Sequence, residues 1–104
     1  MMRGPGVAAL LERRLIAAAQ AAGTGIAITE SRATEWHSAT FSGMRHEIMA
    51  EAPPCPRLDR WLAELAEADL PVAGHLVADI AVAAIERDAA RTRFRLEALT
   101  VANG

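Results

Sequence analysis

Cysteine, aromatic residues and long apolar runs are all scarce in this chain of 104 residues. Cys55 is the single cysteine, so an intrachain disulfide and a two-cysteine redox motif are both excluded. Aromatic residues make up 4% of the chain and tyrosine is absent, so small aliphatic side chains must fill most of the core. No stretch reaches the ~18 apolar residues that a membrane-spanning helix needs.

The charge of the chain also excludes partners. The formal net charge of −2 provides no bulk attraction to nucleic acid or to an anionic membrane, and neither is expected as a partner. The N-terminal segment resembles a signal peptide only superficially, because Glu12, Arg13 and Arg14 interrupt its apolar stretch. A cytoplasmic location is therefore the expectation.

Apolar residues are abundant: 52% of the chain is hydrophobic and 23% is charged. This composition is typical of one globular core, and we expect residues 1–104 to form a single domain with a mobile arm at 1–6. The pattern predicts an α+β two-layer sandwich in the order α-β-β-β-α-β-β, with about five mainly antiparallel strands and both helices packed on one face. The expected helices are 5–22 and 57–70, and the expected strands are 26–31, 35–41, 44–51 and two within 75–101.

Two features of this assignment depend on the turns. Ser42-Gly43 is the best hairpin turn in the sequence and is expected to join the second and third strands. For the last hairpin, a loop with an odd number of residues would set Val82 and Ile80 beside Leu96 and Ala98. We therefore predict a loop of three or five residues, although the alanine-rich segment 76–86 also permits a helix.

One face of the predicted sheet is too apolar to lie in water. With both helices on the other face, it would remain uncovered, and contiguous apolar surface usually marks a contact. We expect this face to form a homodimer. The alternative, one helix on each face, needs no partner. The residues expected at the dimer interface are Val77, Ala81, Ala83, Ile85, Leu99 and Val101.

A second group of residues, which any even-length loop at Ser42-Gly43 places on one face of the first hairpin, has the composition of a small binding site. Arg45 would clamp an anion, with neighbouring hydroxyl groups as orienting donors. The alternative is a polar cross-strand ladder exposed to water. The candidate ligand-binding residues are Trp36, Ser38, Thr40, Arg45 and Glu47.

The remaining reactive residues match no catalytic or metal-binding pattern. His37 and His46 are expected on one face, where they would pair or bind metal, but a third ligand at a recognised spacing is missing. Ser38 lacks a nucleophile-elbow turn, and nothing in the sequence around Cys55 marks it as a thiolate. We expect no metal, no cofactor and no catalytic residues.

Neither the glycine-rich segments nor the basic stripe of the last strand supports a nucleotide site. The two glycine-rich segments do not follow a strand and open a helix. The stripe formed by Arg91, Arg93 and Arg95 could contact nucleic acid, but its acidic neighbours and the net charge of the chain favour a solvated or interface edge. Two hypotheses follow: a non-enzymatic homodimeric interaction module, or a small-molecule binding protein or enzyme with a pocket at the sheet.

Overall fold

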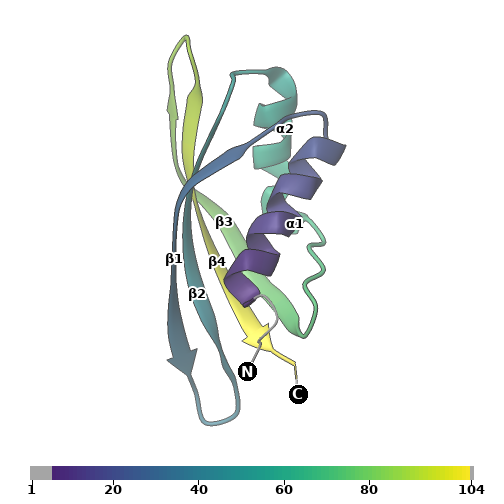
Figure 1. Ribbon diagram of the computed structural model, residues 1–104, viewed down its shortest axis with the longest axis vertical. Coiled ribbons are helices and arrows are strands. Elements are labelled where there is room, and N and C mark those ends of the chain that lie inside the picture. Colours follow the sequence, from purple (N-terminus) through teal and green to yellow (C-terminus); the bar gives the residue numbers. More distant parts are fainter. Residues whose placement is uncertain (1–5, 104) are drawn as a thin grey trace.

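The computed structural model describes residues 6–103, which form two α-helices and one four-stranded antiparallel sheet. The predicted α+β class is confirmed (Figure 1). The element order is α-β-β-α-β-β, one strand fewer than expected. The predicted arm falls largely on residues 1–5, outside the described part. The elements are α1 (Val7–Ala21), β1 (Ala27–His37), β2 (Ser42–Ala52), α2 (Pro56–Glu64) continued by the 3₁₀ helix η1 (Leu65–Glu67), β3 (His75–Arg87) and β4 (Thr92–Ala102).

The missing strand results from a wrongly placed turn. The two strands expected at 26–31 and 35–41 are one continuous strand, β1. The turn that follows is Ser38–Phe41 rather than Ser42-Gly43, because Ser38 closes it with both its backbone and its side chain. The Ser38 N–H donates to the Phe41 carbonyl oxygen at 2.8 Å, and Ser38 Oγ accepts from the Phe41 N–H at 3.0 Å. Gly43 instead lies inside β2.

Both helices lie on one face of the sheet, as predicted (Figure 1). Helix α1 ends in a Schellman motif: Gly23 has a φ of +88°, and the N–H groups of Gly23 and Thr24 donate back to Gln20 and Ala19. Trp61 of α2 meets Phe94 of β4 edge to face, with ring centroids 6.5 Å apart. The buried apolar core comprises Leu11, Leu15, Ala19, Ile48, Ala50, Ala52, Leu58, Trp61, Leu62, Leu65, Leu70, Val72, Ile80, Phe94, Leu96 and Ala98.

Among the described residues, neither helix has the length and apolar character needed to cross a membrane.

The strands are arranged in the order β1-β2-β4-β3, so β1 and β3 are the edges. The final hairpin turns through four residues, Asp88–Arg91, so the predicted odd-length loop is wrong. Val82 nevertheless pairs with Leu96, and Ile80 with Ala98, as predicted. A β-bulge between Val82 and Ala84 supplies the extra residue that the loop was expected to supply.

The two halves of the chain form an internal repeat, which the sequence indicated only in outline, as a helix followed by strands in each half. Strand β4 begins 50 residues after the start of β2. Each of the two hairpins has a four-residue turn that is closed by the side chain of its first residue. In the second turn, Asp88 Oδ1 accepts from the N–H groups of Ala90 and Arg91 at 2.7 and 2.9 Å. The pairing of Glu47 with Glu97 places equivalent residues of the two halves face to face. The sheet therefore has an approximate two-fold axis between these two glutamates.

Candidate interaction surface: the open face of the sheet

The sheet face opposite the two helices carries no covering element within residues 6–103, and we call it the open face. Paired residues of antiparallel strands point to the same side of a sheet, so the register defines which side chains this face presents. They are Ala27, Glu30, Arg32, Thr34 and Trp36 of β1; Gly43, Arg45, Glu47, Met49 and Glu51 of β2; Arg93, Arg95, Glu97, Leu99 and Val101 of β4; and Leu76, Asp79, Ala81, Ala84 and Glu86 of β3.

The open face is more polar than the sequence predicted. Its apolar side chains gather at the end nearest the Ser38–Phe41 turn, where Trp36, Gly43, Val101 and Leu76 follow one another across the four strands. Leu76 is 57% exposed, whereas Trp36 and Val101 are half-buried. The middle and the far end carry charges of both signs. The face thus divides into an apolar end and a mixed-charge remainder.

Charged and apolar residues repeat across the approximate two-fold axis. The pattern Arg-x-Glu-x-Met at residues 45–49 of β2 recurs as Arg-x-Glu-x-Leu at residues 95–99 of β4. Antiparallel pairing sets Arg45 beside Leu99 and Met49 beside Arg95, with the two glutamates between them. Arg95 Nη2 lies 3.7 Å from Glu97 Oε2, which relieves part of the repulsion between the paired carboxylates.

A shallow depression of about 420 Å³ lies over the middle of the open face. Two arginines and three carboxylates border it, and Ala81 and Leu99 form part of its floor. The arginines are Arg32 and Arg45, and the carboxylates are Glu47, Asp79 and Glu97. Within residues 6–103, Arg45, Glu47 and Asp79 take part in no ion pair. The depression therefore offers uncompensated groups of both signs to a partner or ligand.

The five predicted ligand-binding residues do not all meet. Trp36, Arg45 and Glu47 lie on the open face, as the alternation predicted. Ser38 and Thr40 lie in the hairpin turn, where Ser38 Oγ accepts from the Thr40 N–H at 3.4 Å and from the Phe41 N–H. The Ser38 hydroxyl therefore stabilises the turn. Arg32 was not predicted to lie on the open face, since β1 was expected to be interrupted at this residue.

The residues expected at the dimer interface also divide between the two faces. Ala81, Leu99 and Val101 lie on the open face, as predicted. Val77 and Ile85 instead pair with Thr100 and Phe94 on the helix side, so their placement on the open face was wrong.

The physical reason is the pair of β-bulges in β3, at Ala78 and Ala83. Each bulge adds a residue to β3 that has no partner on β4 and reverses the facing of everything beyond it. Ala83 is itself the extra residue of one bulge and is exposed. Leu76 takes the place on the open face that Val77 was expected to occupy.

The histidines do not form a metal site. His46 is 1% exposed on the helix side, where its Nε2 lies 2.9 Å from Thr100 Oγ1. His37 lies on the same side but at the open end of β1, where it is exposed and 3.8 Å from Glu35. No group of three or more histidine, cysteine, aspartate or glutamate side chains suited to a metal ion occurs in the part of the chain that the structure describes. Burial and the nearby His75 lower the pKa of His46.

Cys55 serves as the N-cap of α2. Its Sγ accepts from the Leu58 N–H at 3.4 Å and lies 3.7 Å from Thr24 Oγ1, while Pro56 occupies the first helical position. The hydrogen bond from Leu58, supported by Thr24, lowers the pKa of the Cys55 thiol. The sequence around Cys55 did not indicate this lowered pKa, because the two groups that cause it, the Leu58 N–H and Thr24, come from α2 and from the loop after α1. The contact that the structure shows for this thiol is therefore that of a helix cap.

The capping role of Cys55 can be tested by two substitutions. Cys55→Ser is expected to keep the cap, because a hydroxyl oxygen also accepts from the Leu58 N–H, whereas Cys55→Val leaves that N–H without its partner. The thermal midpoint of Cys55→Val should therefore lie below that of Cys55→Ser. Equal midpoints would show that the thiol contributes by packing alone.

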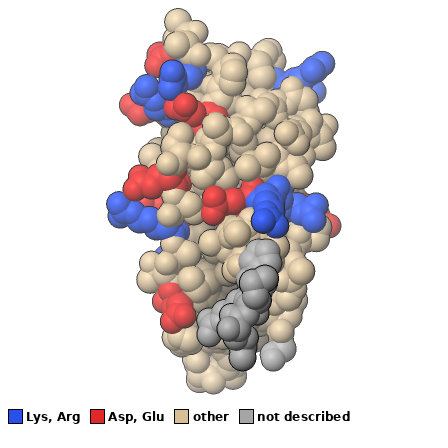
Figure 2. All heavy atoms as spheres, viewed as in Figure 1, with Lys and Arg blue, Asp and Glu red and all other residues tan. Residues whose placement is uncertain are grey.

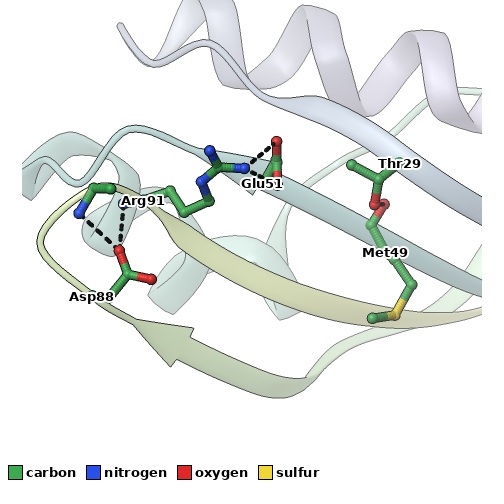
Figure 3. A network of polar contacts seen from close by, with 6 residues as sticks. Thr29, Met49, Glu51, Asp88 and Arg91 are labelled. Atoms are coloured by element: carbon green, nitrogen blue, oxygen red, sulfur yellow. Dashed lines mark hydrogen bonds and ion pairs between the residues drawn. The ribbon is translucent and has the colours of Figure 1, made fainter.

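The arginines of the predicted basic stripe lie beside acidic side chains. Arg91 Nη1 lies 3.1 Å from both carboxylate oxygens of Glu51, which joins the β3–β4 turn to β2 (Figure 3). Arg93 pairs across the sheet with Glu51 on one side and Glu86 on the other. In the view of Figure 2, charges of both signs occur in small mixed groups. On the face in this view, the basic residues form no continuous positive area.

Comparison of the chain with models of known protein families, with curated proteins and with solved structures found no match. The class that the structure itself defines is a two-layer α+β protein with an internally repeated α-β-β unit and one open sheet face.

Proposed function

We propose that the protein is a non-enzymatic, cytoplasmic interaction module that assembles with a second copy of itself through the open face. The observation that carries this proposal is the arrangement of two layers only, with both helices on one side of the sheet. Four strands of about 11 residues, at ~4.8 Å spacing and ~3.3 Å rise, present an area of about 700 Å². A stable interface typically buries about 800 Å² on each partner, so the open face is close to the size that a dimer needs.

The apolar end of the open face supports the same proposal. Trp36, Val101 and Leu76 lie in one row across the sheet, and Leu99 extends this apolar surface from Val101 along β4 toward the depression. The indole Nε1 of Trp36 is shielded from solvent and has no hydrogen-bond partner among the described residues. This nitrogen lies against Gly43, out of reach of a partner, so Trp36 supports the proposal through the half-buried apolar surface of its ring, as aromatic residues at interfaces do.

The charges of the open face are compatible with a second copy. Arg45 is unpaired within residues 6–103, as are Glu47 and Asp79, so one copy offers both the cation and the anions that the other lacks. Charge complementarity of this kind fixes the orientation of partners more than it adds affinity.

The proposal is tested by the mass of the protein in solution, measured by size exclusion with light scattering. The unaltered chain of 11.1 kDa is expected to form an assembly of at least two copies. Leu99→Arg, which adds a charge to the half-buried floor of the open face, should halve the mass. Ile85→Arg is the matched control, because Ile85 is similarly apolar and 37% exposed but lies on the helix side. A monomeric unaltered chain, or dissociation by Ile85→Arg alone, would contradict the proposal.

A second candidate function is binding of a small anionic molecule in the depression. The structure brings Arg32 to the same depression as Arg45, a second cation that the sequence did not predict. The three carboxylates nearby favour a ligand that also carries an amine. Thermal shifts with a panel of amino acids, carboxylates and phosphates test this function. A shift that disappears in Arg45→Ala supports it, and the absence of any shift across the panel contradicts it.

A further inference from the structure

Strand β1 is the least covered part of the sheet. Nine of its 11 residues are exposed, and only Ile28 and Trp36 are half-buried. It forms one edge of the sheet, and in Figure 1 its C-terminal half lies on the side away from the two helices. Its outer backbone edge therefore has no strand partner within the described residues, and an unpaired edge is a template for another strand.

The hydrogen bonds of the first hairpin show which backbone groups point outward. The Ser38 N–H donates to the Phe41 carbonyl across the turn. Because bonding direction alternates along an antiparallel strand, the residues two, four and six before Ser38 also bond toward β2. Ser31, Ala33, Glu35 and His37 therefore direct their N–H and C=O groups to the free edge.

The two edges of the sheet differ in a way that singles out β1. Edge strand β3 is interrupted by two bulges, at Ala78 and Ala83. Bulges hinder an edge strand from pairing with a strand of another molecule. The register shift in β1 is confined to the segment between Ile28 and Glu30. Residues 30–37 are consequently a regular, proline-free edge of eight residues.

We propose that β1 pairs antiparallel with β1 of a second copy, across a two-fold axis at Thr34, and so joins two sheets edge to edge. This interface is separate from the open-face interface proposed above. Axes at Arg32 or Glu35 would place like charges directly opposite each other, which destabilises a strand pair. An axis at Thr34 sets Arg32 opposite Trp36 of the other copy, a cation–π pair, and sets Thr34 opposite Thr34. On the helix side it sets Ala33 opposite Glu35.

Substitutions at Ala33 test the pairing, because its exposed side chain lies on the helix side and not on the open face. Ala33→Pro removes an outward N–H without removing a bond to β2, and should abolish edge pairing. Ala33→Thr keeps the N–H and should retain it. Ile85→Pro, which removes an N–H from the other edge, should also retain it.

Charged substitutions test the register without altering the backbone. Ala33→Glu places a carboxylate opposite Glu35 in both symmetry-related pairs of the edge-paired dimer. The dissociation constant of that dimer should therefore rise by about 2- to 30-fold, and Ala33→Arg should lower it by a similar factor. Weaker association by both variants would overturn the axis at Thr34. Circular dichroism of each variant checks that the fold is kept.

The masses separate the two proposed interfaces. With both formed, the unaltered chain should show four copies, Ala33→Pro and Leu99→Arg two each, and the double variant one. A mass of two that Ala33→Pro reduces to one and Leu99→Arg leaves unchanged would retain the edge interface and overturn the open-face one. A mass that Ala33→Pro leaves unchanged overturns the edge interface.

Discussion

Gly43→Ala is expected to lower the free energy of unfolding by about 1–3 kcal/mol, the usual cost of forcing extra atoms into a well-packed site. A Cβ on Gly43 would overlap with the carbonyl oxygen of Thr100 on the neighbouring strand β4. It would also lie 3.0 Å from the indole nitrogen of Trp36, which covers Gly43 from β1. The neighbouring atom on β4 is backbone and cannot rotate away. The strands must separate locally, and urea unfolding measures the result.

Gly25→Ala is the control for the Gly43 substitution. A Cβ at Gly25 meets no atom within 4 Å, and Gly25 does not need a positive φ. Its substitution should leave stability nearly unchanged or raise it slightly by restricting the unfolded chain. Equal effects at the two positions would show that the close contact at Gly43 relaxes without cost.

Acidification is expected to destabilise the protein through His46. Thr100 Oγ1 donates to the Met44 carbonyl at 3.4 Å, so the Nε2 of His46 donates to Thr100, and its buried Nδ1 has no partner among the described residues. Protonation would place a charge in the core beside His75. Burial first, and His75 second, therefore lower the pKa of folded His46 from its ordinary value of 6.5.

The direction of this pH dependence follows from proton binding. A histidine whose folded pKa is lowered binds more protons in the unfolded state, so its contribution to stability is complete above pH 6.5 and is lost as the pH falls below it. His46→Leu should flatten the change in urea midpoint between pH 6.5 and about pH 5, above the range in which most carboxylates titrate. Leucine suits the site because Leu96 occupies the equivalent position of β4.

His37→Gln is the matched control for this experiment, since it removes an exposed histidine from the same side of the sheet. It should retain the pH dependence of the unaltered chain. If His46→Leu retains the full dependence as well, the titration of His46 does not set the acid stability of the fold.

Side-chain alternation predicted much of the candidate surface. Arg45 and Glu47 were expected to share a face with Trp36, and the register confirms this because any hairpin loop with an even number of residues preserves it. Ala81, Leu99 and Val101 were also placed correctly. Val77 and Ile85 were misplaced, because their facing depends on bulges at Ala78 and Ala83, and no residue type marks an alanine bulge in an alanine-rich strand.

The internal repeat was seen in outline from the element order, but its residue-level form was not. Arg45 and Arg95, and Glu47 and Glu97, are 50 residues apart in the sequence. This spacing indicates a repeat only once β2 and β4 are known to pair with the two glutamates opposite each other. The helices of the two halves obscure the repeat further because they differ in length: α1 has 15 residues and α2 has nine.

The sequence by itself determined the α+β class, the two helices and the inward side of each central strand, because hydrophobic periodicity is a local property of the chain. Only the tertiary structure decided the strand order, the two bulges of β3 and the exposed edge of β1. These depend on which backbone groups pair across long sequence distances, and backbone hydrogen bonding is nearly independent of the side chains that the sequence records.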